Sequence, residues 1–310
     1  MEEAYDVMVP LDVAELREEF QVPHELVTAS DGKIIFVRHW IGSSGTDLAI
    51  LIFHGITAYS EPYGKLLAEE LAGAGFHVFG MDLRGHGRSD GIRGDLPSEE
   101  RLSKDLCETV ASLKAKFSRV VVLGHSLGVL SALIAVNRCP GSIDGLILLS
   151  AGRQIKPGAY SKPRARAVLK TLLGIALFPS RPLIEYNRKG MAGRNDPLFN
   201  FRYSARFYSA MYGMSPWAVV RMLRHNVIDS PNMTTSGTLE IPVLVGVGDQ
   251  DELFSVDSSR EVFDSIRGDR KEFLVVPGGH HASFPPGSWD RVVAWLRTQF
   301  PAAPGGTFSG

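Results

Sequence analysis

Cysteine is scarce in this chain of 310 residues, which contains Cys107 and Cys139 and no other. Two cysteines do not make the disulfide framework of a small secreted domain, so we expect two buried free thiols in helices. No paired His or Cys has metal-ligand spacing, so we predict no metal site. No Gly-x-Gly-x-x-Gly follows the first buried strand, which argues against a dinucleotide site, and we expect no cofactor.

Long apolar runs are also missing. No stretch approaches the roughly 18 apolar residues that a membrane-spanning helix needs. The first six residues are acidic and lack the apolar core of a secretory signal. The formal net charge of −1 does not fit a chain that is basic overall, so we expect no nucleic-acid partner. These absences predict a soluble, cytoplasmic protein.

Strand-like and helix-like segments alternate through most of the chain. Strands are predicted at 24–29, 33–40, 48–53, 76–81, 120–123, 146–150, 241–247 and 273–276. Such alternation is typical of a mostly parallel central sheet with helices on both faces, the α/β class. We therefore expect an α/β core at 23–152 and 239–300, an N-terminal extension at 1–22 and a disordered tail at 301–310.

The alternation stops between residues 153 and 238. Seven prolines interrupt the helix-like segments there, and we predict a helical cap inserted at the sheet edge where active sites lie. Fourteen Lys and Arg against three Asp and Glu give this stretch a net charge of +11, which leaves −12 for the rest. Such charge attracts anions, but an ordinary solvated surface has the same composition. Its apolar segment 168–178 and its aromatic residues suit an acyl-chain pocket or simple core packing.

One pentapeptide stands in a context that makes it specific. The β-branched run Val120–Leu123 leads into Gly124-His-Ser-Leu-Gly128, and an Ala-rich, helix-like segment follows. A strand, Gly-x-Ser-x-Gly and a helix form a nucleophile elbow, which exposes its serine at a helix N-terminus. Ser126 is therefore the predicted nucleophile, and the Leu127 N–H is one predicted oxyanion donor.

Further motifs accompany the elbow, namely His54-Gly55, Gly75–Asp82, Arg84–Ser89 and Gly248–Asp251. With these motifs the chain resembles the α/β-hydrolase superfamily, and within it the monoacylglycerol lipase and lysophospholipase group of serine aminopeptidase S33-type hydrolases. The resemblance implies the α/β-hydrolase fold, with a helical cap insertion. It also implies that the Ile56 N–H is the second oxyanion donor and that His54 braces its loop. The charged cluster Asp82, Arg84, His86 and Arg88 is expected to be structural, as is His125.

The acid of a triad follows its serine in this superfamily, and the histidine comes last. After the strand at 241–247, the candidates are Asp249, Asp251 and Asp257. The family's spacing selects Asp251, three residues after Gly248, and Asp249 remains the alternative.

Two adjacent histidines follow the strand at 273–276. The family places its catalytic histidine four residues after a proline, here Pro277, which selects His281. His280 remains the alternative, otherwise a loop residue that lines the site.

These residues predict a serine hydrolase that cleaves a carboxylic ester with an apolar acyl group through an acyl-enzyme. The expected substrate is a small-molecule or lipid ester, such as a monoacylglycerol or lysophospholipid, and an anionic one would suit the basic cap. That cap also suits contact with an anionic membrane surface or an acyl carrier. The alternatives are a thioesterase or acyl-transfer enzyme on phosphopantetheine-linked substrates, and a non-enzymatic ligand receptor on the same fold.

Overall fold

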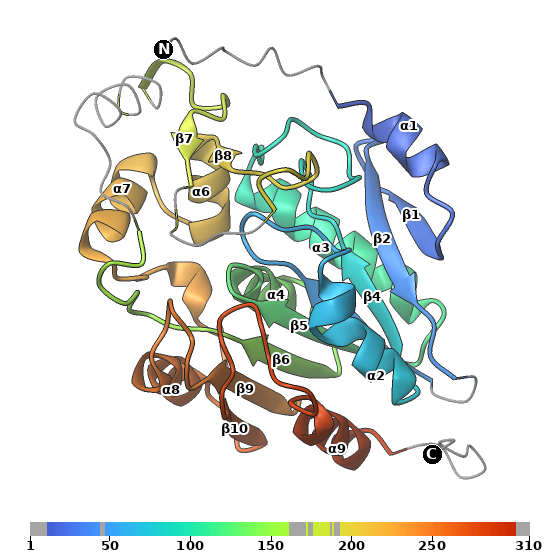
Figure 1. The fold of residues 1–310 in the computed structure, drawn as a ribbon. Coiled ribbons are helices and arrows are strands. Elements are labelled where there is room, and N and C mark those ends of the chain that lie inside the picture. Colours follow the sequence, from blue (N-terminus) through green and yellow to red (C-terminus); the bar gives the residue numbers. More distant parts are fainter. Residues whose placement is uncertain are drawn as a thin grey trace.

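An eight-stranded sheet runs through the molecule (Figure 1). The computed structural model describes residues 11–43, 47–160, 172, 176–186, 188 and 193–301. The strands are β1 (His24–Thr28), β2 (Ile34–Trp40), β3 (Leu48–Phe53), β4 (His77–Met81), β5 (Arg119–His125), β6 (Gly145–Leu149), β9 (Val243–Gly248) and β10 (Lys271–Val276). Their spatial order is β1-β2-β4-β3-β5-β6-β9-β10. The β1–β2 and β2–β4 pairs are antiparallel and the other pairs are parallel, which confirms the predicted sheet.

Helices cover both faces of this sheet. On one face lie α3 (Glu99–Lys114), α4 (Gly128–Arg138) and α8 (Val256–Ser265), and on the other lie α2 (Glu69–Gly73) and α9 (Asp290–Gln299). The short π-helical turn η1 (Gly64–Ala68) precedes α2, and α1 (Val13–Glu18) lies beside the β1 end of the sheet (Figure 1). Every residue of β3 and β6 is buried, as the continuous apolar runs of centrally placed parallel strands predict.

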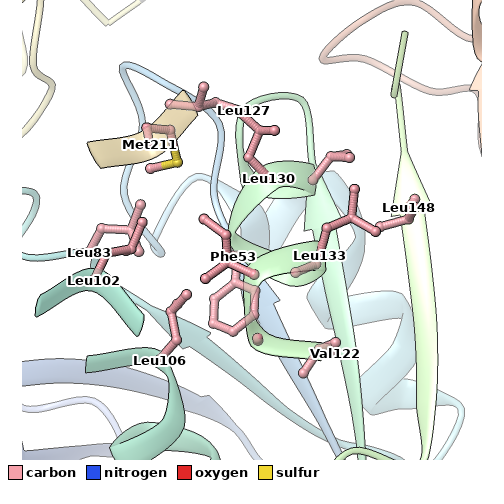
Figure 2. Packing of buried hydrophobic residues seen from close by; sticks show 14 of the residues in the cluster. Phe53, Leu83, Leu102, Leu106, Val122, Leu127, Leu130, Leu133, Leu148 and Met211 are labelled. Carbon is pink, nitrogen blue, oxygen red and sulfur yellow. The ribbon is translucent and has the colours of Figure 1, made fainter. Parts of the chain in front are cut away.

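The core beneath the elbow joins the sheet to α3 and α4 (Figure 2). Leu130 and Leu133 of α4 pack in the same cluster as Phe53 of β3 and Val122 of β5. Met211, which comes from the stretch between β6 and β9, lies beside Leu127 and Leu130 in the same view. This packed core therefore supports Ser126, the residue that follows β5.

The long stretch between β6 and β9 lies beyond the carboxyl ends of the strands (Figure 1). It contains β7 (Ile184–Glu185), β8 (Arg202–Tyr203), α6 (Ala205–Tyr212), α7 (Pro216–His225) and the 3₁₀ turn η2 (Pro231–Met233). We call residues 153–238 the insertion; these bounds stay a prediction. Most of the apolar segment 168–178, the first ten residues and the tail after Pro301 lie outside the described residues.

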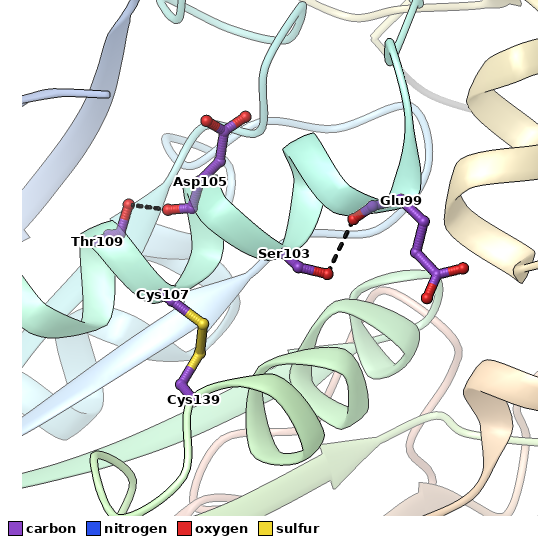
Figure 3. The surroundings of a disulfide bond; sticks show 6 residues. All are labelled: Glu99, Ser103, Asp105, Cys107, Thr109 and Cys139. Atoms are coloured by element: carbon purple, nitrogen blue, oxygen red, sulfur yellow. Dashed lines mark hydrogen bonds between the residues drawn. A yellow bond between two sulfur atoms is a disulfide. The ribbon is translucent and has the colours of Figure 1, made fainter. Parts of the chain in front are cut away.

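A disulfide joins two helices on one face of the sheet (Figure 3). Cys107 of α3 bonds to Cys139, which ends α4, with a Cα–Cα distance of 5.4 Å. The prediction of two free thiols is therefore wrong. The residues are 32 positions apart, and only the side-by-side packing of α3 and α4 brings them together. Within the described ranges, no helix is long and apolar enough to cross a membrane.

Candidate active site

Ser126 sits at a sharp turn between β5 and α4. Its φ of 56° lies in the left-handed region, which non-glycine residues rarely adopt. A Cβ on Gly128 would lie 2.0 Å from the Phe53 carbonyl oxygen, and a Cβ on Gly124 would lie 2.3 Å from the Gly128 oxygen. Only glycine fits at either position, so the two glycines allow strand and helix to approach closely enough to form the turn. The side chain of Ser126 remains partly exposed above the carboxyl end of β5.

The structure brings Ser126, His281 and Asp251 together in one hydrogen-bonded row. His281 Nδ1 lies 2.9 Å from Asp251 Oδ2 and 3.1 Å from Oδ1. A carboxylate accepts, so Nδ1 carries the proton and Nε2 is left as an acceptor. That Nε2 lies 2.9 Å from Ser126 Oγ, where it accepts the hydroxyl proton. The row has the order acid, base and nucleophile that activates a serine.

Asp251 is completely buried in the loop after β9. Burial alone would raise its pKa, but the hydrogen bond from His281 and those from the Phe254 and Leu253 N–H groups outweigh burial and lower the pKa to about 2. The two N–H groups lie 3.0 and 2.7 Å from Oδ1. Asp251 is therefore a fixed negative charge at neutral pH.

The two alternative residues make other contacts. Asp249 is exposed, and its Oδ1 accepts the Gly278 N–H at 2.7 Å, which stabilises the turn before the histidines. The exposed His280 contacts Glu252 Oε1 through Nδ1 at 2.8 Å. Within the described structure, neither side chain is hydrogen-bonded to Ser126. Glu252 also accepts the His281 N–H at 3.0 Å, so it holds the histidine loop without joining the row.

The predicted oxyanion donors flank Ser126. A Cβ on Gly55 would lie 3.3 Å from Ser126 Cβ, so the loop after β3 lies against the serine. Among the described residues, neither the Ile56 nor the Leu127 N–H has a hydrogen-bond partner. His54 orients the Ile56 N–H, because its Nδ1 donates to the Gly55 carbonyl of the same peptide group at 2.8 Å. Its Nε2 accepts the Leu83 N–H at 3.1 Å, which confirms that His54 braces this loop.

A second series of hydrogen bonds leads from Gly55 to the backbone of His281. Tyr63 Oη accepts the Gly55 N–H at 2.8 Å and donates to His125 Nδ1 at 2.7 Å. His125 Nε2 then donates to the His281 carbonyl oxygen at 2.7 Å. Burial lowers the pKa of His125 to about 3, so its ring is neutral, as this pattern requires. The row connects the loops after β3 and β10 with His125, the last residue of β5.

Sequence reasoning missed several residues around this site. Tyr63 and Glu252 belong to no motif of the chain, and only the fold brings them to the two rows. The cluster at 82–88 is structural, as predicted: Arg84 pairs with Asp105 at 2.7 Å, and Asp82 accepts the Ser60 and Arg88 N–H groups at 2.6 and 2.7 Å. Within the described part of the chain, no group of three or more His, Cys, Asp or Glu residues could hold a metal ion.

Known proteins resemble this chain over most of its length. The family model described as serine aminopeptidase, S33, matches residues 45–284. The monoacylglycerol lipase of Mycolicibacterium smegmatis is 27% identical over 83% of this chain and 90% of its own length. The uncharacterized protein YnbC of Escherichia coli is 26% identical over 91% of this chain. This chain spans about half the length of YnbC, with 47% covered, and of human monoglyceride lipase, with 48% covered.

Solved structures share the architecture. The crystal structure of Paleococcus ferrophilus monoacylglycerol lipase is 25% identical, with a TM-score of 0.59 over 86% of this chain and 99% of that one. A soluble variant of the Saccharomyces cerevisiae monoglyceride lipase is 18% identical, with a TM-score of 0.66 over 95% of this chain and 99% of that one, and it supports the fold alone. The fold is the α/β-hydrolase fold. Because the family model covers most of the sheet and all the loops that meet at Ser126, the chain belongs to the serine aminopeptidase S33 family of α/β-hydrolases.

Proposed function

We propose that the protein is a serine hydrolase that cleaves carboxylic esters through an acyl-enzyme. One observation carries this proposal: the unbroken row from buried Asp251 through His281 to the partly exposed Ser126 hydroxyl. In this reading, Asp251, His281 and Ser126 are the catalytic acid, base and nucleophile. We also propose the domain boundaries predicted from the sequence, with an α/β core at 23–152 and 239–300 and a helical cap at 153–238.

The reaction follows from these positions. Ser126 Oγ attacks the ester carbonyl while His281 Nε2 takes its proton, and Asp251 stabilises the resulting imidazolium. The Ile56 and Leu127 N–H groups bind the negative oxygen of the tetrahedral intermediate. His281 then gives its proton to the leaving alcohol. Water attacks the acyl-enzyme with His281 as base, which releases the acid and restores Ser126.

The substrate class rests on the relatives and on the insertion. Relatives named monoacylglycerol lipase support an ester with an apolar acyl chain, such as a monoacylglycerol or lysophospholipid. The insertion's net charge of +11 supports an anionic substrate, an acyl carrier or an anionic lipid surface as a partner. The same charge is the observation that favours the second candidate, a thioesterase acting on phosphopantetheine-linked acyl groups.

The disulfide bears on the compartment in which the enzyme would act. A cytoplasmic location is the expectation from the sequence, and it stays a prediction. Structural disulfides form and persist mainly in oxidising compartments, so the Cys107–Cys139 bond counts against that expectation.

The test compares two serines whose backbones share the left-handed conformation, Ser126 and Ser150. Ser126→Ala is expected to lower kcat for p-nitrophenyl butyrate by roughly 10⁴-fold or more. Ser150→Ala is the matched control: it removes a buried hydroxyl that has no hydrogen-bond partner among the described residues, and it should retain turnover. Unchanged turnover in a folded Ser126→Ala variant would overturn the proposal.

A further inference from the structure

Four consecutive peptide groups of the loop after β3 are held by fixed partners. The core supplies the first two, because Tyr63 accepts the Gly55 N–H at 2.8 Å and His54 donates to the Gly55 carbonyl at 2.8 Å. The next two partners come from the insertion. Tyr203 Oη lies 2.7 Å from the Ile56 carbonyl oxygen, and the Asn200 N–H donates to the Thr57 carbonyl at 2.9 Å.

Tyr203 is well placed to hold the Ile56 carbonyl. Its side chain is fully buried, and its ring packs against Phe207 with a centroid distance of 4.5 Å. Burial raises its pKa, so the hydroxyl keeps its proton and donates. The Asn200 carbonyl oxygen lies 3.0 Å from the same hydroxyl and is the weaker of its two acceptors.

The chain on either side of Tyr203 is itself attached to the core. The Asn200 side chain donates to the Gly85 carbonyl at 2.6 Å, and the Ser204 N–H donates to the Gly94 carbonyl at 2.9 Å. A Cβ on Gly94 would lie 1.9 Å from the Arg202 carbonyl oxygen, so the two chains are in close contact there. Tyr203 therefore has little freedom to move with the rest of the insertion.

From this geometry we propose that Tyr203 is a positioning residue of the oxyanion hole, and that the insertion completes the hole from outside the core. The inference rests on the proposed function, in which the Ile56 N–H binds the oxyanion. The Ile56 carbonyl belongs to the peptide group that directly follows the one containing that N–H. Because His54 holds the peptide group before Ile56 and Tyr203 holds the one after it, the φ and ψ angles of Ile56 are fixed, and with them the direction of its N–H. Preorganised donors stabilise the transition state because they need no rearrangement when charge develops.

The experiment uses Tyr203→Phe, which removes one hydroxyl and keeps the ring. The full chain is assayed with p-nitrophenyl butyrate, and the inhibition constant of an alkyl trifluoromethyl ketone is measured, since its serine adduct carries an oxyanion. Removing an oxyanion donor outright costs 10²–10³-fold, so a displaced donor is expected to lower kcat by about tenfold. The inhibition constant should rise by a similar factor, while KM stays within about twofold.

Tyr59→Phe is the matched control. It breaks another hydrogen bond between core and insertion, from Tyr59 Oη to Asp196 Oδ2 at 2.8 Å, and leaves the Ile56 carbonyl bonded. It should keep the kcat and the inhibition constant of the wild type. Equal losses in the two variants would mean that Tyr203 only docks the insertion, and wild-type kcat in Tyr203→Phe would also overturn the inference.

Two further variants keep the outcomes distinct. If Tyr203→Phe does not fold, 4-aminophenylalanine at position 203 retains a donor at the same place and should retain kcat within about threefold. Loss of kcat in this folded variant would contradict the inference. Ser126→Ala, assayed beside them, separates the two proposals: if it is inactive and Tyr203→Phe is fully active, only the present inference fails. If Ser126→Ala is active, the proposed function itself fails.

Discussion

Asp251 and Asp249 lie two residues apart, yet their carboxyl groups meet different surroundings. Asp251 is fully buried and receives hydrogen bonds from His281 and two backbone N–H groups. Asp249 is exposed and bonds the Gly278 N–H. Buried charge of this kind is tolerated only where hydrogen bonds compensate for lost hydration, so Asp251 is the residue built to remain ionised beside an imidazole.

This difference leads to a prediction for both adjacent pairs. Asp251→Asn and His281→Ala should each lower kcat by roughly 10³-fold or more, because each breaks the row to Ser126. Asp249→Asn and His280→Ala are matched controls that change exposed neighbours, and they should cost less than about tenfold. Steady-state kinetics of the four variants check this. A larger loss in His280→Ala than in His281→Ala would mean that the base is assigned to the wrong histidine.

Asp82 provides a pH prediction. Burial raises its pKa to about 6, although the N–H groups of Arg88 and Ser60 oppose the shift. A carboxyl whose folded pKa lies above its unfolded value of about 3.9 contributes stability below that value and loses it as pH rises through about 6. Between pH 4 and 7, the wild type should therefore lose up to about 3 kcal/mol of unfolding free energy relative to Asp82→Asn.

Urea unfolding of both proteins at several pH values measures this loss. The comparison concerns the slope with pH, since the substitution also changes the hydrogen bonds to Ser60 and Arg88. Parallel stability curves for the two proteins would show that the Asp82 carboxyl does not titrate in this range.

The sequence allowed Ser126, Asp251 and His281 to be predicted because each lies at a fixed distance from a glycine or proline at a strand end. Tyr63, Glu252 and Tyr203 could not be found this way. The hydroxyl of Tyr203 meets Ile56 across 147 residues of chain, and no local spacing encodes such a contact. His54 was foreseen as a brace by family resemblance alone.

At the scale of elements, the strands were predictable because short β-branched runs stand between turn residues. The sequence pattern does not reveal helix α8, although its N-cap Ser255 accepts the Ser258 N–H through the side-chain oxygen at 3.1 Å. The packing of α3 against α4 could not be predicted from the sequence either. Helix faces that are both apolar do not reveal which neighbour each will cover, so the disulfide between them could not be foreseen.

The disulfide yields a prediction about stability. It closes a loop between residues 32 positions apart, which should stabilise the fold by about 2–4 kcal/mol. The double variant Cys107→Ser, Cys139→Ser should lose that amount in urea unfolding. It should keep its kcat, because Cys139 lies at the C-terminal end of α4 (Figure 3), whereas Ser126 precedes the N-terminal end of that helix.

Reduction supplies the control for this prediction. Dithiothreitol should lower the stability of the wild type to that of the double variant and leave the variant unchanged. Equal stability of the oxidised wild type and the double variant would contradict a stabilising role for the bond.

For the whole molecule, the uneven charge is the main feature. The sequence of the insertion carries a net charge of +11, and the rest of the chain carries −12. Exposed charges act mainly on encounter, and salt screens them over about 8 Å at physiological ionic strength. Raising salt from about 0.05 M to about 0.5 M should therefore lower kcat/KM several-fold for an anionic ester such as p-nitrophenyl hemisuccinate. The neutral butyrate ester should respond little.

Charge reversal tests the same prediction. Arg221→Glu with Arg224→Glu changes two exposed residues of α7 and should mimic high salt for the anionic ester alone. Arg267→Glu with Arg270→Glu is the matched control, because these exposed residues lie where β10 begins, at the edge of the sheet away from Ser126. The same response from both pairs would mean that the charge of the insertion has no special role.

The central claim is that Ser126 carries the acyl group during turnover. The most direct measurement mixes enzyme with excess p-nitrophenyl butyrate, quenches with acid within milliseconds and determines the intact mass and the modified peptide. We predict one butyryl group per chain on Ser126 in the wild type, and none in Ser126→Ala. A butyryl group on another residue, or turnover without any covalent adduct on Ser126 when acylation is faster than hydrolysis, would contradict the account.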